Sequence, residues 1–220
     1  VADVMIVAAR TSPMAPSGSD ASQGITLFLV PGNSQGMTIN PLKTISSDRQ
    51  SEVILQNLSV PAASVLGQVD AGWPVAHRAL QRAITGKCLE MLGGADAVLD
   101  MTVEYVKQRT QFGRAIGTFQ AVQHHCANMA TAVEGCRFVT YQAAWRLSEG
   151  LPATREVAIA KGWVSDAYRK LCALAHQSHG AIGFTQEYDL QLYTRRAKAA
   201  ELAFGDPDYH REQVAQLLGV

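Results

Sequence analysis

The pattern of apolar and polar positions changes period near Trp73, from the alternation typical of strands to the spacing typical of helices. Before Trp73, short apolar or alternating runs are separated by Gly, Pro, Ser and Asp. They predict strands over residues 4–10, 24–30, 36–43 and 51–58. Residues 11–23 are rich in Ser, Pro and Gly and predict a loop. Strands that follow one another without a helix between them favour an antiparallel sheet or part of a barrel.

Beyond Trp73, apolar residues recur about every three to four positions, which predicts a long helix from Trp73 to about Arg109. Further helices are expected over residues 119–149, 155–177, 188–204 and 207–218. Gly150 is placed to end the second helix, and Asp206 and Pro207 are placed to begin the last one. The predicted fold class is therefore α+β, with a partial antiparallel β-domain followed by an all-α antiparallel bundle.

Glycines interrupt the first long helix at positions 86, 93 and 94. Each costs about 1 kcal/mol relative to alanine inside a helix. We therefore expect them to allow the close approach of another helix or a ligand.

Composition limits the functional classes. The chain has 220 residues, a formal net charge of +0 and 47% hydrophobic residues, which is enough for one core or two small domains. A neutral charge balance gives no electrostatic reason to expect nucleic acid or an anionic membrane as a partner. We expect no membrane insertion, because no apolar run reaches about 18 residues. No signal peptide is visible, and a start at Val1 directly before a strand is typical of a fragment.

The cysteines and histidines do not predict a metal site. Cys88, Cys126, Cys136 and Cys172 form no Cys-x-x-Cys pair, and we expect reduced, partly buried thiols in a cytoplasmic protein. Neither His124–His125 nor the pair His176 and His179 has an evident third ligand, so polar contacts are the expected role of these histidines.

The stretch Arg109–Gln120 lies between two long predicted helices, where Gly113 and Gly117 break the helical pattern. Arg109 supplies a planar guanidinium and Gln120 an amide, groups that suit phosphate and carbonyl oxygens. Spacing alone favours a helix–loop–helix corner that carries solvated arginines.

The full string Arg-x-x-Phe-Gly-x-x-Ile-Gly-x-Phe-Gln over residues 109–120 resembles a signature of the acyl-CoA dehydrogenase family. Residues 177–184 are similar to a second flavin motif of that family, and the resemblance extends from the first residues to about Gly205. It implies that residues 1–66 are the second half of a middle β-domain and that residues 67–220 are a C-terminal helical bundle domain.

The resemblance implies FAD as cofactor. The family motifs fall on Arg109, Phe112, Gln120, Gln177, Gly180 and Ala181, the last of which replaces a usual glycine. The expected partners are an acyl-CoA thioester as substrate, electron-transfer flavoprotein as electron acceptor, and another subunit. That subunit would form a homodimer, a tetramer or a hetero-oligomer with another acyl-CoA dehydrogenase chain.

A carboxylate base is missing from both positions that the resemblance indicates, which are occupied by Phe204 and Ala83. Two other acids are candidates. Glu90 lies seven residues beyond Ala83, on nearly the same helix face and about 10 Å further along, in an otherwise apolar stretch. Asp206 follows Phe204 closely, although its place before Pro207 also suits an N-cap.

These observations leave several hypotheses open. The chain could be a catalytic acyl-CoA dehydrogenase subunit that desaturates an acyl-CoA thioester at the α,β position. It could instead be a non-catalytic, FAD-supporting subunit of a heteromeric enzyme. A flavin-dependent monooxygenase or oxidase on the same scaffold needs no such base, and a helical oligomerisation module would need no cofactor. The sequence does not identify the acyl chain.

Overall fold

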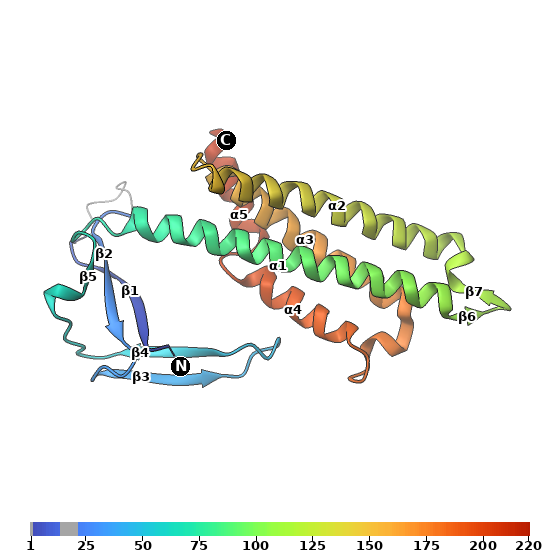
Figure 1. The fold of residues 1–220 in the computed structure, drawn as a ribbon, viewed down its shortest axis with the longest axis horizontal. Coiled ribbons are helices and arrows are strands. Elements are labelled where there is room, and N and C mark those ends of the chain that lie inside the picture. Colours follow the sequence, from blue (N-terminus) through green and yellow to red (C-terminus); the bar gives the residue numbers. More distant parts are fainter. Residues whose placement is uncertain (1, 14–21) are drawn as a thin grey trace. The chain divides into compact units, whose positions relative to one another are not determined.

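The computed structural model describes residues 2–13 and 22–220. The chain forms two compact units, Val1–Leu80 and Gln81–Val220. Figure 1 shows strands in the first unit and helices in the second. Helix α1 (Trp73–Gln108) begins in the first unit and continues into the second. The domain boundary near residue 66 stays a prediction.

The first unit contains the predicted antiparallel strands. β1 (Val4–Arg10) pairs with β2 (Ile25–Pro31), and β3 (Met37–Leu42) pairs with β4 (Gln50–Leu55). The sequence pattern missed the short strand β5 (Val65–Leu66), which pairs with the other edge of β2. Residues 14–21 of the predicted loop lie outside the described residues.

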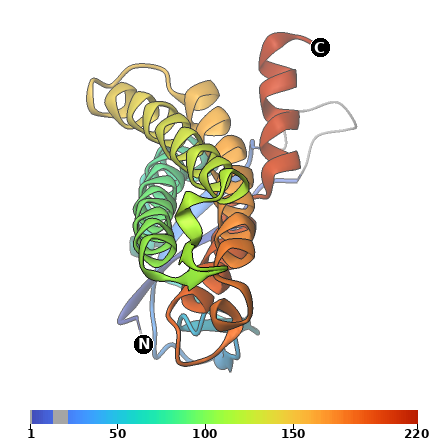
Figure 2. The same cartoon turned by 90° about the vertical axis from the view of Figure 1, so that its right-hand side faces the viewer.

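The second unit is the predicted helical bundle, and its caps follow the sequence signals (Figure 2). After α1 come α2 (Gln120–Ser148), α3 (Thr154–His179), α4 (Leu190–Leu202) and α5 (Pro207–Leu218). The Asp206 carboxylate accepts the Tyr209 backbone N–H at 2.8 Å, as expected of an N-cap. In the described part of the chain, no helix has the length and hydropathy needed to cross a bilayer.

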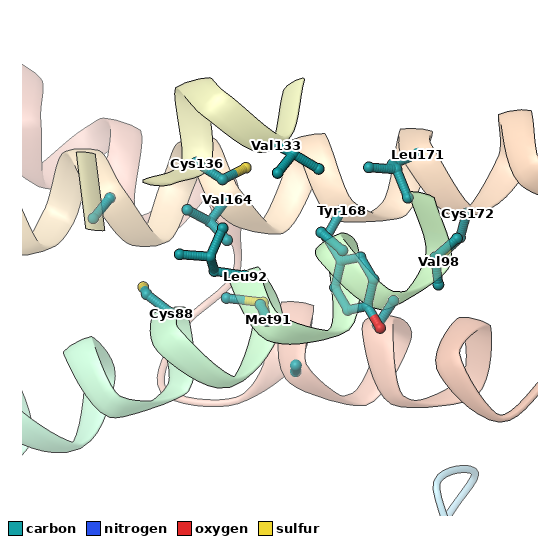
Figure 3. Packing of buried hydrophobic residues seen from close by; sticks show 14 of the residues in the cluster. Cys88, Met91, Leu92, Val98, Val133, Cys136, Val164, Tyr168, Leu171 and Cys172 are labelled. Carbon is teal, nitrogen blue, oxygen red and sulfur yellow. The ribbon is translucent and has the colours of Figure 1, made fainter. Parts of the chain in front are cut away.

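Helix α3 packs against α2, α4 and α5. Apolar side chains from α1, α2, α3 and α4 form the core of the unit (Figure 3). Three of the four cysteines, Cys88, Cys136 and Cys172, are buried in this core, as predicted. Burial raises the pKa of each of these thiols to about 12. They therefore stay neutral and pack as small apolar groups.

The α1 glycines follow the prediction at one position. A Cβ on Gly94 would lie 2.4 Å from the hydroxyl oxygen of Tyr168, so glycine permits the close approach of α3. Around Gly86 and Gly93 there is open space, with no atom within 4 Å of an added Cβ. No other helix of this chain therefore approaches those two glycines closely, and the close approach of a ligand or another subunit there stays a prediction.

Candidate functional site

The segment between α1 and α2 forms a small β-hairpin rather than the helix corner that its spacing suggested. β6 (Thr110–Gln111) pairs with β7 (Arg114–Ala115), and a short 3₁₀ turn, η2 (Ile116–Thr118), leads into α2. The turn residues Phe112 and Gly113 have φ values of +53° and +79°. Positive φ at both central residues is the pattern of tight hairpin turns that match the twist of the strands.

This hairpin presents its polar and aromatic groups to solvent. Phe112 at the tip is 92% exposed. Arg109, directly before the hairpin, and Gln120, the first residue of α2, are also exposed. The Arg114 guanidinium covers the Phe119 ring, with 4.1 Å between Cζ and the ring centroid. Within the described residues, the Arg109 guanidinium makes no hydrogen bond or ion pair. It is therefore uncommitted and able to bind an anion.

The second motif lies where α3 ends. The helix stops at Gly180, whose φ of +67° closes the last turn, and the 3₁₀ turn η3 (Gly180–Phe184) follows. Gln177, Gly180 and Ala181 are all exposed. Phe184 is 70% exposed, so this segment also presents an apolar surface.

The segments that carry the two motifs lie at the same end of the helical unit (Figures 1 and 2). Aromatic and imidazole side chains connect the helix ends that lead into them. The Tyr105 ring stacks on His179 with centroids 4.3 Å apart, and the Tyr105 hydroxyl donates to the His179 carbonyl at 3.3 Å. The Tyr188 hydroxyl lies 3.0 Å from Nε2 of the same histidine. The structure therefore brings the predicted cofactor residues of both motifs to one region of the surface.

The buried histidines at this junction are neutral groups. Burial lowers the pKa of His176 and of His179 below the ordinary value for imidazole. Both make polar contacts, as expected, but their position between the two motifs was not predicted. Among the described residues, no cluster of three or more His, Cys, Asp or Glu side chains could hold a metal ion.

A second strained turn lies between α4 and α5. Phe204 and Gly205 have φ values of +60° and +97°. The buried Lys161 ammonium donates to the carbonyls of Glu201 and Gly205 at 2.9 and 2.8 Å. His210 Nε2–H donates to the Phe204 carbonyl at 3.0 Å. Donors from α3 and α5 therefore fix the turn while the Phe204 side chain stays 44% exposed.

The structure corrects the surroundings expected for Glu90. Its side chain is 53% exposed, and its carboxylate accepts from the Lys87 ammonium at 2.5 Å. It therefore lies on the solvated side of α1 rather than in an apolar environment. Asp206 is engaged as the N-cap of α5, as its sequence position also suggested.

The described helices border cavities of different sizes. One of about 430 Å³ lies beneath the hairpin and is bordered by Val106, Gly117, Gln123 and Cys126, among others. A larger one of about 630 Å³ is bordered by α2, α3 and α5 and includes none of the predicted cofactor residues. No predicted cofactor residue borders the smaller cavity either, but Ala115, Gly117 and Thr118, which border it, lie between Arg109 and Gln120 in the first motif.

Comparisons with known proteins show which family this chain resembles. Residues 70–219 match the family model for the acyl-CoA dehydrogenase C-terminal domain. The chain is 33% identical over 199 residues, 89% of its length, to the mitochondrial short/branched chain specific acyl-CoA dehydrogenase of Bos taurus, of which it spans 46%.

Solved structures agree across the whole chain. Butyryl-CoA dehydrogenase from Megasphaera elsdenii superposes with a TM-score of 0.92 at 31% identity, covering 100% of this chain and 57% of that one. The structure of PigA with FAD and proline gives a TM-score of 0.91 at 26% identity, with coverage of 100% and 57%. The chain thus spans about half the length of the proteins it resembles.

Proposed function

Because this chain belongs to the acyl-CoA dehydrogenase family, we propose that it acts in an FAD-dependent oxidoreductase that desaturates an acyl-CoA thioester between its α and β carbons. The observation that carries the proposal is the junction of both motif segments at one end of the helical unit, through Tyr105 and His179. PigA, which shares the fold, is described in complex with FAD.

The residues at this junction have the chemistry that FAD requires. The exposed Arg109 guanidinium would bind the diphosphate, because planar forked donors suit phosphate oxygens. Gln120 and Gln177 carry amides that both donate and accept, and Gly180 permits a close approach of the cofactor. When bound, FAD would accept the hydride that leaves the substrate β-carbon.

The reaction also needs a base for the α-proton, and the reduced cofactor needs an electron acceptor. Removing the α-proton and transferring the β-hydride together oxidise the substrate by two electrons. We propose electron-transfer flavoprotein as the acceptor that reoxidises the cofactor, and an oligomer, either of this chain or with a related subunit, as the working form.

A second candidate function is that of a non-catalytic subunit that supports FAD for a partner chain. The observation in its favour is the absence of an acid at Ala83 and Phe204, combined with the solvated, ion-paired state of Glu90. In that case the partner would supply the carboxylate base, and this chain would supply the cofactor contacts.

Anaerobic titration with a panel of acyl-CoA thioesters tests both candidates. The protein is purified with FAD, alone and with any related subunit encoded beside it, and flavin absorbance is followed. Bleaching by the protein alone would mean that it carries its own base. Bleaching that requires the partner would identify it as the supporting subunit. If neither preparation binds FAD, the proposed function is wrong.

If the protein alone is active, Glu90→Gln is the next variant. Loss of a general base slows flavin reduction by about 10² to 10⁴-fold. Glu104→Gln is a matched control, because Glu104 also accepts from a lysine three residues away on α1, at 2.7 Å from Lys107. Equal rates for both variants would exclude Glu90 as the base.

A further inference from the structure

We propose that His179 is a positioning residue that holds the two cofactor segments, residues 109–120 and 177–184, at a fixed separation. This inference rests on the proposed function. His179 is 4% exposed and lies at the end of α3, directly before Gly180. Its side chain contacts α1 on one side and the segment before α4 on the other. It is therefore the residue through which both motif segments meet.

All hydrogen-bonding atoms of the His179 ring are used. Nδ1–H donates to the Ala175 carbonyl at 2.8 Å, because a carbonyl can only accept. In the neutral ring, Nε2 is then an acceptor, and the Tyr188 hydroxyl donates to it at 3.0 Å. Tyr105 stacks on the ring and donates its hydroxyl to the backbone carbonyl of the same histidine. One side chain thus fixes the position and rotation of the peptide that enters Gly180.

The same contacts continue into the first motif. The Arg109 backbone N–H donates to the Tyr105 carbonyl at 2.8 Å, and Ile116 N–H donates to the Arg109 carbonyl at 2.8 Å. A continuous path of contacts therefore connects Gly180, through His179 and Tyr105, to the backbone of Arg109. Movement of the imidazole would change the separation between the segment that carries Gly180 and the one that carries Arg109.

His176 has a related but different role, which makes it a useful comparison. Its ring stacks on Phe184 at 4.3 Å, and its Nε2 lies 2.7 Å from the Thr194 hydroxyl oxygen. Its side chain therefore connects η3 to α4. His176→Gln should loosen η3 without separating it from Arg109.

Because burial lowers the pKa of His179, the neutral ring is the form that the fold holds. The titratable and charged groups on the surrounding elements are Tyr105 of α1, His125 of α2 (through Ser178), His176 of α3, and Tyr188 with the adjacent Asp189 before α4. A proton added at Nε2 removes the acceptor for Tyr188 and places a charge in a buried site. Acidification should therefore weaken FAD binding by disturbing this junction.

Fluorescence titration of the complete apoprotein with FAD, at pH values from 5.5 to 8, tests the proposal. The variants are His179→Phe, which keeps a ring but loses the polar contacts, and His179→Gln, which keeps a donor and an acceptor but does not titrate. Tyr105→Phe removes a single hydroxyl and is the variant least able to disturb folding. His77→Gln, outside the helical unit, is the control, and urea midpoints are measured in parallel.

We expect His179→Phe to weaken FAD binding about tenfold or more and Tyr105→Phe about threefold to tenfold, the range for loss of one to two hydrogen bonds. His179→Gln should bind within about threefold of wild type at neutral pH and lose most of the pH dependence. If the wild type binds FAD while His179→Phe and Tyr105→Phe keep its affinity and pH profile, the positioning role is wrong and the proposed function stands. If the wild type binds no FAD, the proposed function fails and the inference fails with it.

Discussion

The same dipeptide, Phe-Gly, occupies two strained turns of the helical unit with different supports. Phe112 and Gly113 have φ values of +53° and +79°, and Phe204 and Gly205 have +60° and +97°. A left-handed conformation costs a non-glycine residue about 1–2 kcal/mol, so each phenylalanine carries similar backbone strain. The two turns differ in the contacts that hold this strained backbone in place.

The turn at Phe204 is held by the rest of the protein, whereas the turn at Phe112 is held by its own hairpin. A Cβ on Gly205 would lie 2.4 Å from Cδ1 of Tyr209, but a Cβ on Gly113 would have no atom within 4 Å. Buried donors from α3 and α5 bind the carbonyls of the Phe204 turn. The Phe204 turn is therefore part of the packed structure, and the Phe112 turn is a projecting surface suited to contact with a cofactor or another chain.

The largest expected effect comes from removing the lysine that holds the Phe204 turn. Lys161→Met keeps most of the volume but leaves the carbonyls of Glu201 and Gly205 without their donor. Leaving one buried and one partly buried acceptor unpaired should lower the free energy of unfolding by about 3 kcal/mol, measured by urea denaturation.

Lys198→Met is the matched control, because Lys198 is half-exposed and pairs with the Glu201 carboxylate at 3.2 Å. Exposed pairs contribute about 0–1 kcal/mol, so this variant should stay close to wild type. Equal losses from the two lysines would show that the turn does not depend on the buried ammonium.

The next largest loss of stability is expected from substituting the glycines of the two turns. Gly113→Ala should cost about 1 kcal/mol, because its only penalty is the left-handed backbone. Gly205→Ala adds a clash with Tyr209 and should cost about 2–3 kcal/mol. Denaturation of the single variants, and of Gly205→Ala combined with Tyr209→Ala, separates the two contributions. A double variant as unstable as Gly205→Ala alone would show that the clash with Tyr209 is not the cause.

Acidification should have a smaller effect on the free energy of unfolding. Burial lowers the pKa of His210 in the folded protein, whereas the unfolded chain has the ordinary value of about 6.5. Between these values the unfolded state binds more protons, so stability rises with pH through this window and is lost as pH falls. His210→Gln keeps an N–H donor for the Phe204 carbonyl and should flatten that dependence, as measured by urea midpoints from pH 5 to 8.

The residues that act on this histidine are Lys161, which lowers its pKa, and Gln213 and Asp206, which raise it. The lowered pKa values of His176 and His179 make stability depend on pH in the same direction. The contribution of His210 is therefore the difference in pH dependence between the wild type and His210→Gln. His124→Gln, at an exposed position on α2, is the control. If the urea midpoints of wild type and His210→Gln depend on pH identically, His210 does not contribute to the pH dependence of stability.

The fold could be predicted where the signal is local. The helices, their caps at Gly150 and Asp206, and the longer strands follow from periodicity and from residues within a few positions of each boundary. Strands β5, β6 and β7 were missed because a strand of two residues carries no measurable period. The cofactor segments were found because both motifs are contiguous in sequence.

The parts that could not be predicted depend on distant contacts. Lys161 is buried because its acceptors belong to residues 40 and 44 positions away, a pairing that no local pattern reports. Similarly, the spacing of His176 and His179 placed them on one helix face, but the partner Tyr105 lies 74 residues away from His179. The apolar run around Glu90 was misleading because Lys87, one helical turn away, draws the carboxylate to the solvated face.

The smallest change in stability is expected for Phe112→Gly, which should nevertheless weaken FAD binding clearly. Phe112→Gly relieves the strained backbone and loses one edge contact with Phe119, whose centroid lies 6.1 Å away. The free energy of unfolding should therefore change by less than about 1 kcal/mol. If the projecting turn serves the cofactor, FAD affinity should fall about tenfold in fluorescence titrations, since a stacking or apolar contact of about 1.4 kcal/mol is lost. A variant with lower stability and unchanged FAD affinity would instead place Phe112 within the fold, and the two Phe-Gly turns would then have the same role.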